Sequence, residues 1–203
     1  MLLALPPHGR GTRIGLFGGS FDPTHRGHVT ASETARHRLG LDQVWWLTTP
    51  GNPLKQRHPD LSLSDRIAKA AAMTQGRRIS VTGIEAGIGS RYTADTVLWL
   101  RQRMKSVSLV WIMGADNLVG FHKWQDWRRI MSAVPIAIVD RPGYTLSALA
   151  APAARRFRNS RIPERQARAL PYLAPPAWVF LHGPRVALSS TELREKARRP
   201  RTS

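Results

Sequence analysis

The chain has 203 residues, 42% of them hydrophobic, which is enough for one globular domain with a substantial core and too many for a disordered chain. It has no cysteine, which excludes disulfides, thiolate catalysis and cysteine-based zinc sites and fits a reducing cytoplasm. Lys and Arg number 31 against 13 Asp and Glu, so the formal net charge is +18 and we expect polyanions, either nucleic acid or small phosphorylated substrates, to be attracted. No stretch approaches the roughly 18 apolar residues of a membrane span.

The first residues precede any regular element. Their apolar run, Leu2 to Leu5, is broken at once by Pro6 and Pro7, and it lacks the basic lead and longer apolar segment of a secretory signal. We therefore expect residues 1–12 to be a disordered extension and residues 13–199 to form one domain.

From Arg13 onward, short apolar runs alternate with helical patterns. Strands are predicted at 14–17, 44–47, 79–82, 109–113, 136–139 and 178–181. Helices are predicted at 28–39, 65–73, 94–104, 127–131 and 191–199, with Gly40 ending the first and Ser64 and Thr93 capping the next two. Residues 144–176 are rich in Arg, Ala and Pro and predict no definite element. The alternation indicates an α/β fold with a parallel sheet covered on both faces, in which ligands bind beyond the carboxyl ends of the strands.

The most informative segment follows the first predicted strand and reads GGSFDPTHRGH, residues 18–28. Gly18 and Gly19 lack a Cβ, so the backbone can turn tightly and approach a phosphate. The helix that follows presents unpaired N–H groups. His25 and His28 are three residues apart, so near a helix start both can lie on one face and donate to phosphate oxygens. The motifs GxxxxGK[ST] and GxGxxG do not occur here.

A second candidate phosphate site lies near the end of the chain, in SSTELR, residues 189–194. Ser189 and Glu192 have the spacing of a capping box, which marks a helix start with free N–H groups. Arg194 falls in the first turns of that helix and can reach the same phosphates as the first loop.

The two segments resemble the GxFDPxHxGH motif and the C-terminal motif of the nucleotidylyltransferase superfamily. The resemblance implies a Rossmann-like, doubly wound single domain and in-line displacement at an α-phosphate, without a covalent enzyme intermediate. His25, His28 and Arg194 are then the expected catalytic residues. Gly114 and Asp116 lie where the adenosine ribose and base are expected. The residues expected to bind ATP are Gly18, Gly19, Ser20, Phe21, His25, His28, Gly114, Asp116, Ser189, Ser190 and Arg194.

Further segments resemble the bacterial nicotinate mononucleotide adenylyltransferases: GADN at 114–117, FHKWQDWRRI at 121–130, RYT at 91–93, NPLK at 52–55 and RPG at 141–143. This resemblance covers residues 13–194 and implies transfer of AMP from ATP to nicotinate mononucleotide in NAD biosynthesis. The residues expected to bind nicotinate mononucleotide are Lys55, Arg91, Tyr92, Thr93, Trp124 and Arg141.

The chemistry of these residues fits that acceptor. The indole of Trp124 can stack on the electron-poor pyridine ring. Backbone N–H groups of Tyr92 and Thr93, at a helix start, can receive the nicotinate carboxylate. Lys55 and Arg141 can form ion pairs with a phosphate group of the substrates.

Mg²⁺ is implied as the cofactor because protein cations alone rarely neutralise ATP phosphates, and we expect the phosphates and water to hold most of its coordination shell. No protein metal ligand is expected.

ATP and nicotinate mononucleotide are the expected partners, and neither nucleic acid nor a membrane is expected to bind. Two alternatives stay open, a pantetheine phosphate acceptor and a nucleic-acid-binding module. Use of nicotinamide mononucleotide and a homo-oligomeric state also stay open.

Overall fold

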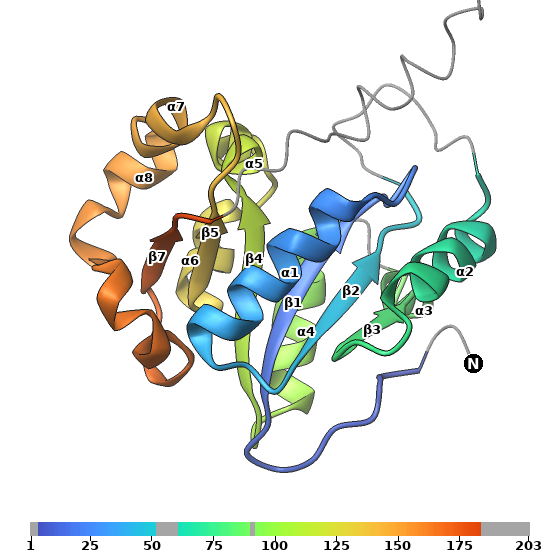
Figure 1. Cartoon of the computed structure of the whole chain (residues 1–203). Coiled ribbons are helices and arrows are strands. Elements are labelled where there is room, and N and C mark those ends of the chain that lie inside the picture. The colour runs from blue at the N-terminus through green and yellow to red at the C-terminus, as the bar shows by residue number, and fades with distance from the viewer. Residues whose placement is uncertain (1–3, 52–60, 90–91, 184–203) are drawn as a thin grey trace, which may run out of the picture.

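A parallel β-sheet forms the centre of the molecule. The computed structural model describes residues 4–51, 61–89 and 92–183 (Figure 1). Within them the sheet has seven strands in the order β3-β2-β1-β4-β5-β7-β6, and every neighbouring pair is parallel. The strands are β1 (Arg13–Gly19), β2 (Gln43–Thr48), β3 (Ile79–Thr82), β4 (Ser108–Gly114), β5 (Ile136–Val139), β6 (Arg161–Ile162) and β7 (Trp178–Leu181).

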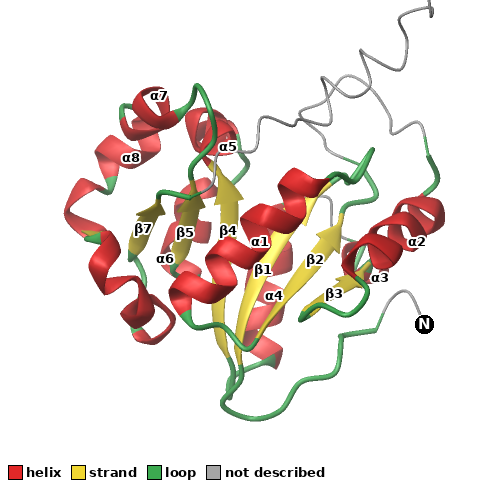
Figure 2. Cartoon of the chain, viewed as in Figure 1, coloured by secondary structure: helices red, strands yellow, loops and turns green. Residues whose placement is uncertain are grey.

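Helices connect the strands and cover both faces of the sheet. They are α1 (Arg26–Leu39), α2 (Leu63–Thr74), α3 (Ile84–Gly87), α4 (Thr93–Arg103), α5 (Ala115–Gly120), α6 (Trp127–Ala133), α7 (Thr145–Leu149) and α8 (Pro152–Arg156), with 3-10 turns η1 (Phe121–Lys123), η2 (Arg158–Ser160) and η3 (Glu164–Tyr172). Figure 2 shows α1 in front of the sheet and α4 and α6 behind it. Successive residues of β2 accordingly pack into different cores, Trp45 with Val97 of α4 and Trp46 with Ala35 of α1. The prediction of a doubly wound α/β fold is confirmed.

The ends of the helices differ in detail from the sequence prediction. Gly40 ends α1 with φ of 67°, the left-handed conformation that glycine adopts most easily. The cap of α2 is Ser62, whose hydroxyl accepts from the Asp65 N–H at 3.1 Å, so the predicted cap at Ser64 is wrong. Thr93, predicted as the cap of α4, is instead its first residue and follows Tyr92 at the cap.

All six predicted strands are present, and β6 is the strand that the sequence prediction missed. It has two residues and lies within 144–176, which folds as short helices and turns around it. A two-residue strand carries no periodic signal of its own, so only its pairing with β7 reveals it.

The arginine-rich stretch packs partly against aromatic residues of β7. Arg161 lies over the rings of Trp178 and Phe180, with its guanidinium carbon 5.4 Å and 5.9 Å from their centroids. Glu164 bonds His182 at 2.8 Å and pairs with Arg38 at 3.5 Å, which joins η3 to α1 and to the end of β7.

Residues 4–12 form no helix or strand but contact the domain. The Thr82 hydroxyl donates to the carbonyl of Ala4 at 3.1 Å, and the Gln43 side chain donates to the carbonyl of Pro7 at 3.0 Å. Leu5 packs against the core. These contacts differ from the disordered extension that the sequence predicts for residues 1–12. No helix in the described part of the chain is long and apolar enough to cross a membrane.

The sheet order reverses beside β1, which is the point at which open α/β sheets form a ligand-binding crevice. The chain moves from β1 outward to β2 and β3 and then returns to the other side of β1 as β4. The connections after β1 and β4 therefore leave the sheet in opposite directions at neighbouring carboxyl ends, which is where open α/β sheets bind ligands.

Candidate active site

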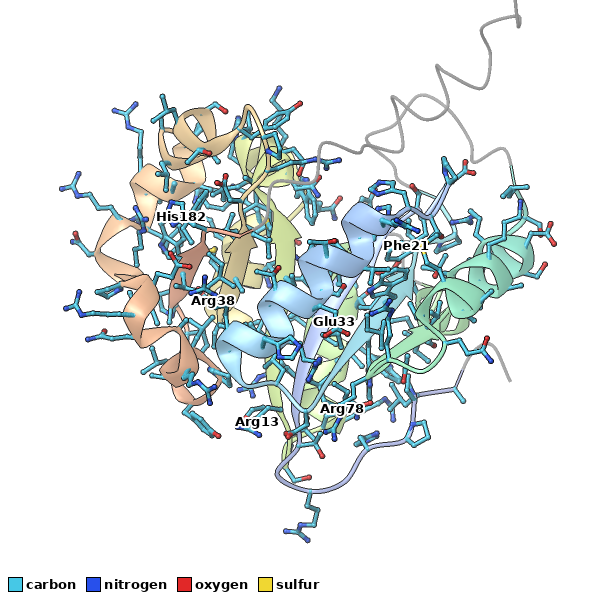
Figure 3. All side chains as sticks on the ribbon, in the orientation of Figure 1. Arg13, Phe21, Glu33, Arg38, Arg78 and His182 are labelled. Carbon is cyan, nitrogen blue, oxygen red and sulfur yellow. The ribbon has the colours of Figure 1, made fainter. Side chains whose placement is uncertain are left out.

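The loop between β1 and α1 is held by one buried aromatic ring. Phe21 has φ of 49° and is 1% exposed. Its ring stacks on Trp46 of β2, with centroids 4.6 Å apart and planes 7° from parallel. Figure 3 labels Phe21 at the carboxyl end of β1, opposite Arg13. This stacking fixes the middle of the loop between β1 and α1 against the sheet.

Gly18, near the end of β1, is required by packing. A Cβ at this position would lie 2.6 Å from Cη2 of Trp111, a buried residue of β4. At Gly19 a Cβ would lie 3.3 Å from the Phe21 ring. The two glycines therefore let the first loop and its neighbours pack closely at the crevice.

His25 and His28 lie together at the start of α1, as their spacing predicts. His25 is the N-cap residue and is buried, and the two imidazoles stack with centroids 3.7 Å apart. The backbone N–H of His25 donates to Nδ1 of His28 at 3.2 Å. Because Nδ1 accepts this bond, the neutral ring of His28 carries its proton on Nε2. The site thus holds an N–H donor in a fixed orientation.

Aromatic side chains surround His28 on the sheet side. The centroids of Phe17, Phe21 and Trp46 lie 6.1, 5.1 and 5.9 Å from that of the imidazole. The indole N–H of Trp46 donates to the buried hydroxyl of Ser32 in α1 at 2.7 Å. These contacts hold the imidazole before any ligand binds, which is the arrangement that favours electrostatic catalysis.

Arg66 of α2 joins the loop after β1 to the loop after β2. Its side chain is 1% exposed, and Nη1 donates to the carbonyls of Ser20 and Thr49 at 2.8 and 2.7 Å. Burial lowers the pKa of the guanidinium, against the attraction of the buried Asp22. The sequence analysis missed this residue. The sequence feature that indicates its burial is the helical spacing of four residues, which places Arg66 on the same face of α2 as the buried Ala70.

Asp116 and Arg141 form an ion pair between the segments that follow β4 and β5. Nη1 of Arg141, which follows β5, donates to Oδ2 of Asp116 at 2.5 Å. Oδ1 of Asp116 is buried and accepts no hydrogen bond from the residues that the structure describes. Oδ1 of Asp116 can therefore accept a hydrogen bond from a ligand at the start of α5, next to its cap residue Gly114. The pair also joins Arg141, predicted on the acceptor side, to a residue predicted on the ATP side.

The residues predicted to bind nicotinate mononucleotide lie in two places, at the start of α4 and directly after η1. Tyr92 caps α4 in an extended conformation, and Thr93 is the first helical residue, so α4 begins at the segment predicted to bind the carboxylate. Trp124 follows η1 and is half-buried, with its ring at the edge of Phe121 and the centroids 5.2 Å apart. The partly exposed indole leaves surface on which a flat ring can stack.

Glu85 in α3 is a second residue that the sequence analysis missed. Its carboxyl group is buried, accepts a hydrogen bond from the hydroxyl of Thr96 at 3.4 Å and lies near the hydroxyl of Thr49. Burial raises the pKa of Glu85 to about 7, more than the two hydroxyls lower it. A single Glu between short apolar runs gives no sequence signal of burial.

Several predicted residues lie outside the described part of the chain: Lys55, Arg91, Ser189, Ser190, Arg194 and the predicted helix at 191–199. Within the described ranges no group of three or more His, Asp or Glu side chains could hold a metal ion.

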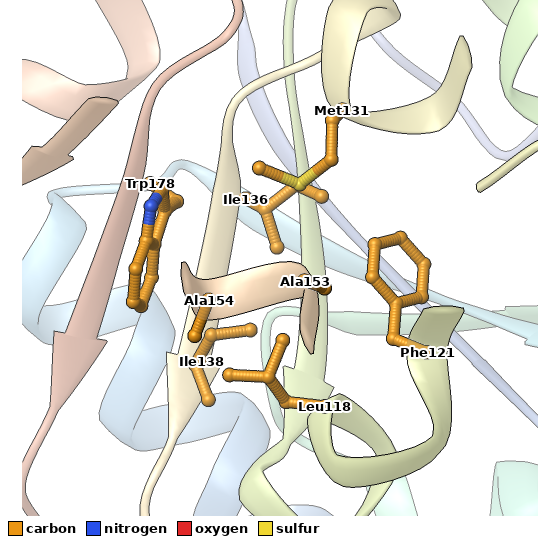
Figure 4. A pocket seen from close by; sticks show the side chains of 8 residues that line it. All are labelled: Leu118, Phe121, Met131, Ile136, Ile138, Ala153, Ala154 and Trp178. Carbon is orange, nitrogen blue, oxygen red and sulfur yellow. The ribbon is translucent and has the colours of Figure 1, made fainter. Parts of the chain in front are cut away.

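A small pocket between α5, α6, α8 and the sheet is lined by apolar side chains such as Phe121, Ala153 and Trp178 (Figure 4). Its lining does not suit a phosphorylated ligand.

Comparison with known proteins identifies the family of the chain. A family model described as cytidylyltransferase-like matches residues 16–196. A protein of Methylorubrum extorquens, named probable nicotinate-nucleotide adenylyltransferase, is 56% identical over 91% of this chain and 100% of the relative. A protein of the same name from Rhizobium meliloti is 53% identical over 89% of this chain and 96% of the relative.

A solved structure shares the fold. Plasmodium falciparum nicotinic acid mononucleotide adenylyltransferase, complexed with NaAD, has a TM-score of 0.67 and 14% sequence identity, covering 91% of this chain and 83% of that chain. Together with the match of the family model and the identity of the bacterial relatives, this places the chain in the cytidylyltransferase-like family, among the nicotinate-nucleotide adenylyltransferases.

Proposed function

We propose that this protein transfers AMP from ATP to nicotinate mononucleotide, forming nicotinate adenine dinucleotide and pyrophosphate. The observation that carries the proposal is the stacked pair of His25 and His28 at the start of α1, beside the point where the sheet order reverses. Such a site offers N–H donors and a helix N-terminus to a phosphate group. Membership of the family supports the same reaction.

The reaction needs no nucleophile from the protein. A phosphate oxygen of nicotinate mononucleotide attacks the α-phosphorus of ATP, and the bond from that phosphorus to the oxygen bridging to the β-phosphate breaks. Negative charge then grows on the departing pyrophosphate. The Nε2–H of His28 donates to the reacting phosphate, and His25 beside it contributes a second imidazole. Both groups act by stabilising charge in the transition state.

The acceptor is recognised on the other side of the crevice. The indole of Trp124 stacks on the pyridine ring, and the N–H groups at Tyr92 and Thr93 receive the nicotinate carboxylate. A carboxamide presents an NH₂ donor where these donors need an acceptor. On the ATP side, the buried Oδ1 of Asp116 accepts from a ribose hydroxyl.

Mg²⁺ enters with ATP in this proposal. Asp22, the acidic residue of the first loop, is buried beside Arg66, so it does not offer a free carboxylate to the ion. We infer that the ATP phosphates and water hold the metal, where it neutralises phosphate charge during transfer. We propose that the phosphate groups are also bound by Lys55, Ser189, Ser190 and Arg194, which can donate hydrogen bonds to their oxygens.

Pyrophosphate release from ATP with three acceptors tests the proposed function. We expect nicotinate mononucleotide to exceed nicotinamide mononucleotide by at least about tenfold in kcat/KM and phosphopantetheine to be inactive. Trp124→Ala should raise KM for the acceptor much more than KM for ATP. Equal turnover of the acid and the amide would contradict the carboxylate site, and turnover of phosphopantetheine alone would overturn the proposed reaction.

A further inference from the structure

One indole of β2 lies at the centre of the contacts that hold the first loop and α1. Trp46 stacks face to face on Phe21 of that loop, and its indole N–H donates to the hydroxyl of Ser32 in α1 at 2.7 Å. The side chains of Trp46 and Ser32 are completely buried. A single residue of the sheet therefore contacts the chain both before and after the two histidines.

The hydrogen bond from Trp46 is not a general consequence of burial. Trp45 and Trp111 are also buried indoles, and their N–H groups have no acceptor among the residues that the structure describes. On the helix side, Ser32 is the polar residue on the buried face of α1, where a hydroxyl group without a partner would be costly. The bond between Trp46 and Ser32 is thus a specific polar link between α1 and the sheet.

Ser32 lies one turn beyond His28 on the same helix. Residues four apart in an α-helix share a face, so a shift of α1 along the sheet at Ser32 also moves His28. The rings of Trp46 and Phe21 lie edge-on to the imidazole of His28, with centroids 5.9 and 5.1 Å away. The indole therefore fixes the position of the helix and limits the orientation of the His28 ring.

The position of His28 is important for phosphate transfer. Its Nδ1 accepts the backbone N–H of His25 at 3.2 Å, which leaves the proton of the neutral ring on Nε2. A donor stabilises the transition state only when it lies within hydrogen-bond distance of the oxygen on which charge develops. A displacement of about 1 Å can lower the rate of the chemical step by about 10²-fold.

We propose that Trp46 and Ser32 are positioning residues, whose hydrogen bond holds α1 in the place where His28 meets the reacting phosphate. The bond acts on the transfer step rather than on binding of the acceptor, because Tyr92 and Trp124 lie on other elements, at the start of α4 and after η1. The kinetic part of this proposal rests on the proposed function, whereas the structural part does not.

Removal of either partner tests the proposal by steady-state kinetics. Ser32→Ala and Trp46→Phe should each lower kcat by at least about tenfold, while KM for nicotinate mononucleotide stays within about twofold, because His28 is displaced and the acceptor residues are not. A wild-type kcat in Ser32→Ala would refute the proposal. A rise in the acceptor KM with an unchanged kcat would contradict the assigned step.

The matched control is a buried indole that makes the same kind of bond elsewhere. The N–H of Trp178 donates to the carbonyl of Phe157 at 2.8 Å, and Trp178 lies on β7, with β4 and β5 between it and β1. Trp178→Phe should lower the stability to urea, as Trp46→Phe does, but keep the wild-type kcat. An equal loss of kcat in Trp178→Phe would mean that the effect of Trp46→Phe is one of stability alone.

The double variant shows whether the two residues act through one bond. Either single substitution already removes the bond, so Ser32→Ala combined with Trp46→Phe should lower kcat no more than about twofold beyond the lower single variant. Losses that multiply, to about 10²-fold, would mean that the residues act independently and would exclude the shared bond as the cause.

A measurement without substrate separates this proposal from the proposed function. In nuclear magnetic resonance spectra of the ligand-free protein, Ser32→Ala should speed solvent exchange of the Trp46 indole N–H and shift the ring nitrogen signals of His28. Unchanged His28 signals in Ser32→Ala would sink the positioning role alone. A protein that shows these changes but does not turn over nicotinate mononucleotide would sink the proposed function alone.

Discussion

Single residues in the first loop are held in a fixed geometry by their neighbours. His28 accepts the backbone N–H of His25 on one ring nitrogen and is surrounded by aromatic rings, so its other nitrogen points a donor in one direction. The spacing of the two histidines predicts that they share a face, but the tautomer follows only from the hydrogen bond in the folded loop.

Replacement of His25 tests its assignment to the reacting phosphate. His25→Ala should lower kcat by about 10²-fold or more, because a group that stabilises transition-state charge is lost. Steady-state kinetics measure the loss, and circular dichroism checks the fold. His37→Ala provides the matched control, since His37 lies on the same helix with its side chain 68% exposed. Turnover of His25→Ala within a few-fold of wild type would remove the residue from the mechanism.

Gly18 provides a test of packing at the same scale. Gly18→Ala should lower the free energy of unfolding by about 1–3 kcal/mol, because the new Cβ meets the indole of Trp111, which is enclosed in the core. Urea denaturation measures the change. Gly120→Ala is the control, since a Cβ there meets no atom within 4 Å. Equal stability of the two variants would mean that the sheet adjusts freely around Trp111.

At the scale of elements, α2 positions two loops from one buried side chain. Arg66 bonds the carbonyl of Ser20 in the loop after β1 and those of Thr49 and Pro50 in the loop after β2. The amphipathic pattern of α2 predicts the helix, but the carbonyls that Arg66 binds become its neighbours only when β1 and β2 pair in the sheet.

Removal of the Arg66 guanidinium should affect both substrates. Arg66→Met should raise KM for ATP and for the acceptor and lower the free energy of unfolding by about 2–4 kcal/mol, because buried carbonyls lose charged donors. Arg66→Lys should recover only part of the loss, since one ammonium cannot copy the planar fork. Lys69→Met, on the exposed side of α2, is the control. A defect confined to one substrate would show that the two loops are positioned separately.

At the scale of the whole molecule, stability should depend on pH through Glu85. Its pKa rises from 4.5 to about 7 on folding, so its contribution is complete below about pH 4.5 and is lost as the pH rises through 7. The loss should reach about 3 kcal/mol, set by that shift. Urea denaturation at a series of pH values should show a decline that Glu85→Gln lacks. Parallel curves for the two proteins would mean that Glu85 does not titrate differently on folding.

The sequence by itself determined the sheet and the close placement of the two histidines in the first loop, and only the tertiary structure decided what supports them. Apolar runs, the glycine that ends α1 and the histidine spacing are local patterns, set by residues within one or two turns of each other. The bonds of Arg66 and Glu85 and the pair of Asp116 with Arg141 join residues far apart in the chain, such as Arg66 and Ser20, 46 positions apart. The charged groups of these residues are buried or paired only because the pairing of strands brings distant segments together. A local pattern in the sequence carries no information about such long-range contacts.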